Sequence, residues 1–340
     1  MGTRAETTIW MWAFGYFACY APYSALAKAL SGGSLPRAGA TSGLAILPVS
    51  IATSVVGMIV FLWATGWWRY ATRGVVAGIT VPMPSRFTLA SGLCTAVIAA
   101  TTTLSYTFKG ISIVFAMLLM RGGVLILAPI VDAITGRRVQ ATSWLALGLS
   151  LAALIIAFLE DGGWQLSAIA AIDIGAYLVS YFVRLQLMSH KAKSGNRSET
   201  LRFFVEEQLV ATPAVLLALV AVACCVDGEL GDAIRVGFTE VPFGSALPYA
   251  IAIGVLSQGT GVFGGLVLLD GRENSFCVPV NRSASVLAGV LASVSLWALL
   301  DAKLPSVHQF VGAAVLIAAI VALSVPTLKK AWAATRRQGA

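Results

Sequence analysis

Two arginines lie deep inside apolar runs of this sequence, Arg121 in LLMRGGVLIL and Arg282 in VNRSASVLAG. A charged side chain at the centre of a bilayer costs about 2.5–3.5 kcal/mol on insertion-derived scales, so such residues usually serve a function. The guanidinium group presents a planar fork of N–H donors that matches phosphate or carboxylate, and a poorly hydrated cavity strengthens that attraction. We therefore expect Arg121 and Arg282 to hold the anionic group of a ligand.

Two other interpretations of these arginines stay open. Each could form an ion pair inside the protein, Arg121 with Asp173 at a similar depth, and Arg282 with Glu206 or Glu207. A contact with lipid phosphate is the third alternative.

Asp173 is the acid placed deepest in an apolar run. Buried without a partner, a carboxyl group can take up a proton near neutral pH, which makes Asp173 a candidate coupling residue. An ion pair with Arg121 or Arg184 is the alternative. Glu206 is a second candidate for coupling or for an ion pair.

Tyrosines and small polar residues could line a partly hydrated cavity. Tyr16 and Tyr20, like Tyr177 and Tyr181, are four residues apart, so each pair shares a helix face on which an organic ligand could stack. An interfacial aromatic belt is the competing explanation. Ser257 and Gln258 stand among glycines that favour close helix packing, yet a buried primary amide needs partners, so both are candidate binding residues.

Catalytic and metal-binding signatures are absent from the sequence. It has no HExxH motif, no phosphate loop of P-loop spacing and no paired histidine and acid. The two histidines are far apart, and all five cysteines fall in apolar runs. We expect no enzyme activity, no metal and no cofactor.

The elements that must position these residues are membrane helices. Hydrophobic residues make up 58% of the 340-residue chain and charged residues 11%, with a mean hydropathy of +0.85. Spans of roughly 20 apolar residues recur along the whole chain, which predicts an all-α membrane protein with ten transmembrane helices. The predicted spans are 8–30, 43–67, 87–107, 111–135, 143–159, 166–189, 203–226, 246–269, 276–299 and 306–326.

The net charge of +8 follows the predicted topology. Fifteen of the 23 basic residues fall on one side of these spans, five on the other and three inside them. By the positive-inside rule both termini are cytoplasmic, and a basic cytoplasmic tail ends the chain. Because topology explains the basic excess, we expect no nucleic-acid partner. The predicted location is the inner (plasma) membrane, as a multi-pass protein.

The chain also shows an internal repeat. A shift of 161 residues places Arg121 on Arg282, and Tyr16 and Tyr20 on Tyr177 and Tyr181. An odd number of spans per unit requires the second unit to enter the membrane from the opposite side. We therefore predict two inverted five-helix repeats, 1–160 and 161–340, an arrangement found in secondary transporters whose substrate site lies between the repeats.

Two stretches carry a resemblance to a known family. The segment TLSYTFKGISIVFAMLLMRGGVLILAPIVDAITGRRV resembles the third and fourth helices of the drug/metabolite transporter superfamily, of the EamA-like and nucleotide-sugar-transporter-like kind. VNRSASVLAGVLASVSLWALL and VHQFVGAAVLIAAIVAL resemble its ninth and tenth helices. Where the family commonly has PVF in helix four, this chain has GGV at residues 122–124. In phosphate-carrying branches basic residues on helices four and nine hold the anion, so the resemblance implies that role for Arg121 and Arg282.

These expectations combine into one functional hypothesis. The chain is expected to move a small anionic or zwitterionic metabolite across the inner membrane by alternating access, with Arg121 and Arg282 in a central cavity. The alternatives are a flippase for a phosphorylated lipid or lipid-linked sugar, and a non-transporting structural or receptor-like membrane protein. The expected partners are the substrate and the lipid bilayer, and a homodimer is left open.

Overall fold

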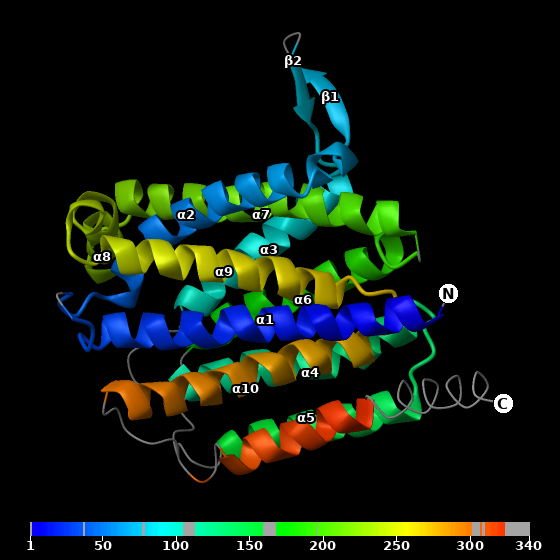
Figure 1. The fold of residues 1–340 in the computed structure, drawn as a ribbon. Coiled ribbons are helices and arrows are strands. Elements are labelled where there is room, and N and C mark those ends of the chain that lie inside the picture. Colours follow the sequence, from blue (N-terminus) through cyan, green and yellow to red (C-terminus); the bar gives the residue numbers. More distant parts are fainter. Residues whose placement is uncertain are drawn as a thin grey trace.

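The structure, a computed structural model, describes residues 2–36, 38–76, 79–104, 113–158, 168–194, 196–300, 307 and 310–323. These residues are mostly helical (Figure 1). The elements are α1 (Gly2–Ser31), α2 (Gly43–Ala64), η1 (Trp67–Tyr70), β1 (Arg73–Val76), β2 (Ile79–Pro82), α3 (Arg86–Leu104), α4 (Ile113–Ile134), α5 (Ala141–Phe158), α6 (Ala168–Lys191), α7 (Arg197–Cys225), α8 (Glu229–Thr239), η2 (Val241–Phe243), α9 (Leu247–Leu268) and α10 (Asn274–Leu300). A further apolar helix covers Phe310–Leu323.

A helix lies at each of the ten sequence ranges predicted as spans. Among the described residues, five helices are long and apolar enough to cross a membrane, at Gly43–Ala64, Ala170–Lys191, Arg197–Cys225, Leu247–Leu268 and Asn274–Leu300. Ala141–Ala153 and Phe310–Leu323 are shorter apolar helices. The chain is thus a helical, multi-pass membrane protein.

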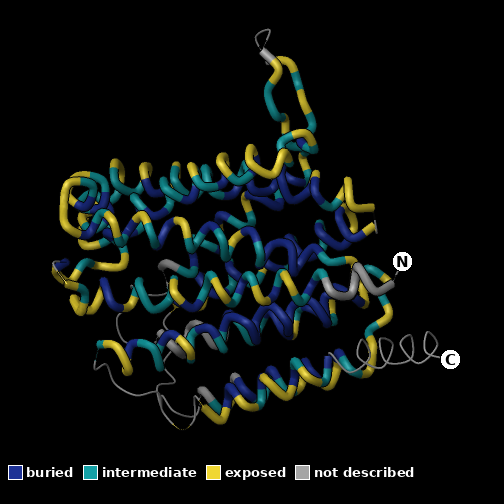
Figure 2. Tube along the Cα trace, in the orientation of Figure 1, coloured by how far each residue is buried: buried dark blue, intermediate teal, exposed yellow. Residues whose placement is uncertain are grey.

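The outward surface of the helices is apolar, as a membrane protein requires. Large hydrophobic side chains point away from the bundle, with Trp63 81% exposed, Ile172 72%, Phe14 70% and Leu217 69%. A protein in water would leave no such continuous apolar surface uncovered. Buried residues gather along the inner helices (Figure 2), and α10 is buried without interruption from Asn274 to Ser285. The polar side chains of the interior therefore face other helices or a cavity.

Close packing fixes the position of α9 against α1 and α2. A Cβ atom added at Gly254 would lie 2.5 Å from the carbonyl oxygen of Ser50 on α2. One added at Gly259 would lie 2.6 Å from the Sγ of Cys19 on α1. Glycine is needed at both positions because the backbone of α9 lies directly against a neighbouring helix, with no room for a side chain. Small residues permit such close helix packing in membranes. The helices α1, α2 and α9 accordingly form one packed group, and α3, α6 and α7 form another.

The connection after α2 differs from the prediction, because it contains an antiparallel β-hairpin that the all-α class does not include. Arg73 pairs with Pro82, Val75 with Thr80 and Val76 with Ile79. The segment is rich in β-branched residues, which favour strands. Its two strands are too short to be recognised from periodicity alone. The hairpin leaves the bundle across the direction of the helices (Figure 1).

The connection after α7, residues 227–245, contains the short helix α8 and the turn η2. α8 lies at the end of the bundle opposite the start of α1 (Figure 1) and packs against α2 and α7. Arg235 on α8 donates hydrogen bonds to the carbonyl oxygens of Ala223 (2.8 Å) and Val226 (2.7 Å). These bonds satisfy carbonyls that the end of α7 leaves free, and so they fix α8 in place.

Some predictions fall outside the described residues. They are the repeat boundary at 160/161 and the basic tail beyond residue 323.

Candidate functional site: a cavity lined by arginines and tyrosines

A single large cavity of about 1420 Å³ brings together most of the predicted site residues. Its lining comes from α1, α2, α3, α4, α6, α7, α8, α9 and α10. The predicted residues in it are Arg121, Arg282, Tyr16, Tyr20, Tyr177, Tyr181, Ser257 and Gln258. At one end the lining includes Lys28 and Ser31 at the end of α1 and Glu229 at the start of α8, so the cavity reaches the α8 end of the bundle.

Arg282 lies deep in this cavity. Its guanidinium carbon is 4.8 Å from the centre of the Tyr181 ring, a cation–π contact. The Nε and Nη2 atoms are buried and have no hydrogen-bond partner in the described part of the chain. Buried donors are nearly always satisfied, so these two N–H groups are available to an acceptor from water or a ligand.

Arg121 enters the same cavity from α4. Its Nη2 donates a hydrogen bond of 3.2 Å to the hydroxyl oxygen of Tyr20. Tyr20 in turn packs against Tyr16, with ring centroids 5.4 Å apart, and against Tyr23 at 5.7 Å. On α6 the rings of Tyr177 and Tyr181 are 4.9 Å apart. The two tyrosine pairs thus line the cavity beside the two arginines.

The acids considered as partners of Arg282 have other partners. Glu207 accepts from Arg184, with 2.8 Å between Nε and Oε1 and 3.1 Å between Nη2 and Oε2. Its Oε1 also accepts from Ser91 (2.5 Å) and Thr95 (3.2 Å). The bidentate pair is buried and ties α7 to α3 and α6. Among the described residues neither Arg121 nor Arg282 has a carboxylate partner.

Asp173 is buried on α6 but is not part of the cavity lining. Its Oδ2 has no hydrogen-bond partner within the described ranges, and no ion pair links it there to Arg121 or Arg184. Asp173, Tyr177, Tyr181 and Arg184 are separated by four, four and three residues, so all four lie on one face of α6. The structure therefore leaves Asp173 with the burial that a proton-binding carboxyl group needs.

Gln258 and Ser257 line the cavity from α9. The Nε2 of Gln258 is 3.5 Å from the Sδ of Met58, a weak contact that leaves its amide oxygen for another partner. The sequence analysis does not assign a binding role to several further lining residues, namely Tyr23, Lys28, Arg184, Gln208, Thr212 and Asn281. Gln208 and Asn281 could have been found from their neighbours, since Gln208 follows Glu206 and Glu207 and Asn281 precedes Arg282 in otherwise apolar spans.

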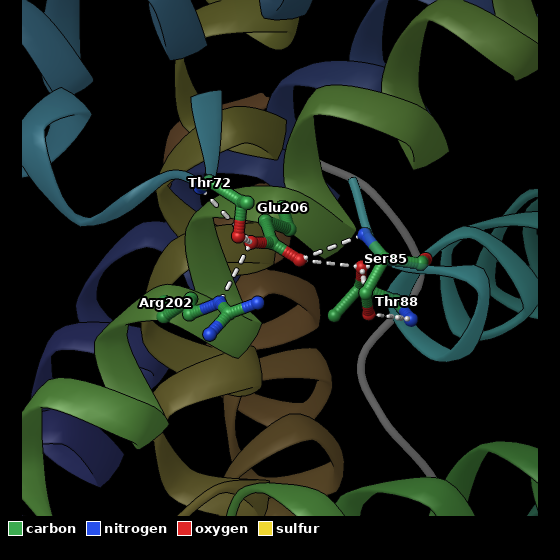
Figure 3. Close-up of polar contacts among 5 residues, drawn as sticks. All are labelled: Thr72, Ser85, Thr88, Arg202 and Glu206. Carbon is green, nitrogen blue, oxygen red and sulfur yellow. Dashed lines mark hydrogen bonds and ion pairs between the residues drawn. The ribbon is translucent and has the colours of Figure 1, made fainter. Parts of the chain in front are cut away.

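Glu206 lies outside the cavity and holds the base of the hairpin (Figure 3). Its carboxylate accepts hydrogen bonds from the backbone N–H (3.1 Å) and hydroxyl (2.5 Å) of Thr72, from the N–H of Ser85 (3.1 Å) and from the hydroxyl of Thr88 (2.7 Å). Arg202 on the same helix completes the set as an ion pair, with 3.0 Å between Nε and Oε1. Of the two predictions for Glu206, the structure contains the ion pair, with Arg202 in place of Arg282.

A buried polar network fills the end of the bundle opposite α8. Asp132 on α4 accepts four hydrogen bonds of 2.7–2.8 Å from the start of α10, two from Asn274 and two from Ser275. A carboxylate at a helix N-terminus satisfies free backbone N–H groups and interacts favourably with the helix dipole. Asp132 therefore fastens the end of α4 to the start of α10.

Two cations strengthen this network. Arg137 donates to the carbonyl oxygens of Gly271 (3.0 Å), Ser189 (3.2 Å) and Lys193 (2.9 Å). The Nζ of Lys193 donates to the carbonyl oxygen of Arg272 at 3.0 Å. These bonds join the ends of α4 and α6 to the start of α10. None of these residues lines the cavity.

Comparisons with known proteins define the fold only. No family model matches the chain, and no curated protein matches it. It is similar to a solved structure described as "Crystal structure of protein", with a TM-score of 0.61 and 14% sequence identity over 95% of this chain and 97% of that chain. The arrangement of helices is therefore shared along almost the whole chain with a protein of known structure.

Proposed function

We propose that this chain is a ten-helix secondary transporter of the inner membrane that moves a small organic anion or zwitterion by alternating access. The observation that carries the proposal is the pair Arg121 and Arg282, which line one cavity without a carboxylate partner in the described part of the chain. Two buried positive charges that the protein does not neutralise would be costly in the membrane interior. A negatively charged ligand supplies the missing charge, and we call the two arginines the anion clamp.

The tyrosines suit the organic part of such a ligand. Tyr16, Tyr20, Tyr177 and Tyr181 place flat aromatic faces and hydroxyl groups beside the anion clamp. An aromatic ring with a hydroxyl can stack on an organic ligand and also donate a hydrogen bond to it. The cavity volume of about 1420 Å³ is larger than a typical small-molecule pocket, which leaves room for a ligand together with water.

The helix contacts support the inverted repeat. Under the 161-residue shift α1 corresponds to α6, α3 to α9 and α4 to α10. α1 packs against α9 and α10, and correspondingly α6 packs against α3 and α4. Likewise α2 packs against α9, as α7 packs against α3. Matching contacts in both halves are what two related five-helix units would give, as in the drug/metabolite transporter superfamily that the sequence resembles.

The distribution of charge gives the proposed orientation. The hairpin and the Arg137 network carry basic residues, which by the positive-inside rule favours a cytoplasmic location for that end of the bundle. In this proposed orientation the cavity, which reaches the opposite, α8 end, opens to the outside, and the Asp132 network lies at the cytoplasmic end. Alternating access then requires that network to open while the α8 end closes.

The first experiment identifies a ligand. Purified protein is heated with a panel of carboxylates and phosphate monoesters at millimolar concentration, because a bound ligand raises the apparent melting temperature in proportion to ln(1 + [L]/Kd). Ligands that stabilise the wild type and fail to stabilise Arg282→Gln are then tested for flux in proteoliposomes that contain this protein alone.

The same vesicles separate the alternatives. A transporter exchanges the internal labelled anion for the external one above the rate of protein-free liposomes. A flippase moves a short-chain fluorescent phospholipid between leaflets and leaves the anion in place. A structural protein moves neither, and that result would refute the proposed function.

A further inference from the structure

The β-hairpin lies at a defined position relative to the helices. It begins after η1, directly beyond the end of α2, and extends across the helix direction (Figure 1). Since the helices cross the membrane, a segment perpendicular to them runs along the membrane plane. The hairpin is therefore directed over the lipids beside the bundle.

The aromatic residues before the hairpin indicate its depth. Trp63 in the last turn of α2 is 81% exposed, and Trp67, Trp68 and Tyr70 lie in η1, four to seven residues later. Tryptophan and tyrosine gather at the level of the lipid headgroups. A two-stranded sheet has unpaired backbone groups along both edges, which hydrocarbon does not tolerate but the hydrated headgroup layer does. Both observations place the hairpin in that layer.

The anchor of the hairpin keeps this direction fixed. Thr72 precedes β1 and Ser85 follows β2, and both are bound by the carboxylate of Glu206 (Figure 3). The N–H of Met83 also donates to the carbonyl oxygen of Thr72 at 2.7 Å. Because both ends are attached to one buried side chain on α7, the hairpin projects as a rigid arm.

The hairpin surface combines positive charge with apolar side chains. Arg69, Arg73 and Arg86 are exposed, and none has a carboxylate partner in the described portion of the chain. Val75 is 72% exposed and Met83 57%. In β1 Arg73 and Val75 share one face, as alternate residues of a strand do. Basic and apolar residues together are the composition of a surface that binds an anionic bilayer.

We propose that the hairpin lies flat in the headgroup layer, where Arg69, Arg73 and Arg86 bind acidic phospholipids and Val75 inserts among the acyl chain ends. This surface is independent of the cavity and of the substrate. It holds the end of the bundle near the hairpin at a fixed depth in the membrane. The partner is the lipid surface itself, and its chemistry is a layer of phosphate-bearing, negatively charged headgroups.

The test uses a fluorescent label on the arm. Val75→Cys is labelled with an environment-sensitive dye in a background carrying Cys224→Ser and Cys225→Ser, because those two cysteines are exposed. The protein is placed in nanodiscs of phosphatidylcholine, with or without phosphatidylglycerol. The expected result is a blue-shifted emission that is protected from iodide when phosphatidylglycerol is present.

The basic residues are tested with two matched double variants. Arg73→Gln with Arg86→Gln should lower the ratio of protected to exposed label by roughly 25-fold, since each basic side chain contributes a factor of about five near an anionic surface. The control, Arg138→Gln with Arg197→Gln, removes two exposed charges away from the hairpin and should change nothing. Equal iodide quenching in both kinds of nanodisc would overturn the proposal. Protection that appears only after cytosolic extract is added would assign the arm to a protein partner and overturn it as well.

Discussion

Replacing Arg282 by glutamine separates a ligand-binding arginine from a structural one. Its Nε and Nη2 are buried without partners in the described part of the protein, and under the proposed function the ligand supplies their acceptors. Losing a charge-assisted contact costs about 1.5–3 kcal/mol, which raises Kd by about ten- to a hundred-fold. Arg282→Lys keeps the charge but lacks the fork of donors, so its affinity should fall between those of the wild type and Arg282→Gln.

The substitution Arg282→Gln weakens ligand binding but is not expected to destabilise the ligand-free protein. Arg282→Gln removes a buried charge that has no described counter-charge, so the apparent melting temperature without ligand should stay equal or rise. Arg184→Gln is the matched control, because it removes the same group from a buried pair with Glu207. Breaking such a pair leaves an uncompensated charge and costs about 3–5 kcal/mol. Arg184→Gln should therefore melt at a clearly lower temperature.

The assay is thermal unfolding in detergent, with and without the anion that stabilises the wild type most. The expected pattern is a lost ligand-induced shift with a preserved ligand-free melting temperature for Arg282→Gln. If Arg282→Gln destabilises the ligand-free protein as much as Arg184→Gln does, the arginine is structural. Unchanged affinity in Arg282→Gln would also refute the anion clamp.

Three further predictions concern coupling, topology and gating. Asp173→Asn should abolish accumulation driven by a pH gradient while sparing substrate exchange, since Asp173 is buried with an unpartnered Oδ2; unchanged proton-driven uptake would remove it from the mechanism. Arg235→Cys should react with an impermeant maleimide from outside intact cells, and reaction from the cytoplasm alone would reverse the topology. Asp132→Asn should loosen the start of α10 and make buried Cys277 reactive toward thiol reagents in inside-out vesicles. Lost transport with Cys277 still unreactive would contradict that role.

The sequence predicted where helices form because long apolar runs leave the backbone no alternative in a bilayer. It also predicted that Arg121, Arg282 and the four tyrosines share one cavity, through helical spacing and the repeat. What periodicity could not supply was the choice of partner for each charge. Glu207 is one residue from Glu206, yet one pairs with Arg184 on another helix and the other binds Thr72 and Ser85.

The Asp132 network was missed for a related reason. Asp132 stands two residues before the end of α4, where an acid ordinarily faces solvent or headgroups. Its burial depends on the start of α10 reaching it from the other half of the chain, a contact across 142 residues of sequence. The hairpin was missed because strands of four residues are too short for a pattern to emerge.

The consecutive acids Glu206 and Glu207 have a mechanical consequence. Neighbouring residues on an α-helix project about 100° apart around its axis, since a turn holds 3.6 residues. A helix held through one side chain can still roll about its own axis, whereas one held through two diverging side chains cannot. α7 is held in this way, through Glu206 to the hairpin base and the start of α3, and through Glu207 to α3 and α6. A change in the tilt of α7 therefore moves the hairpin with it, because the base of the hairpin is attached to this helix.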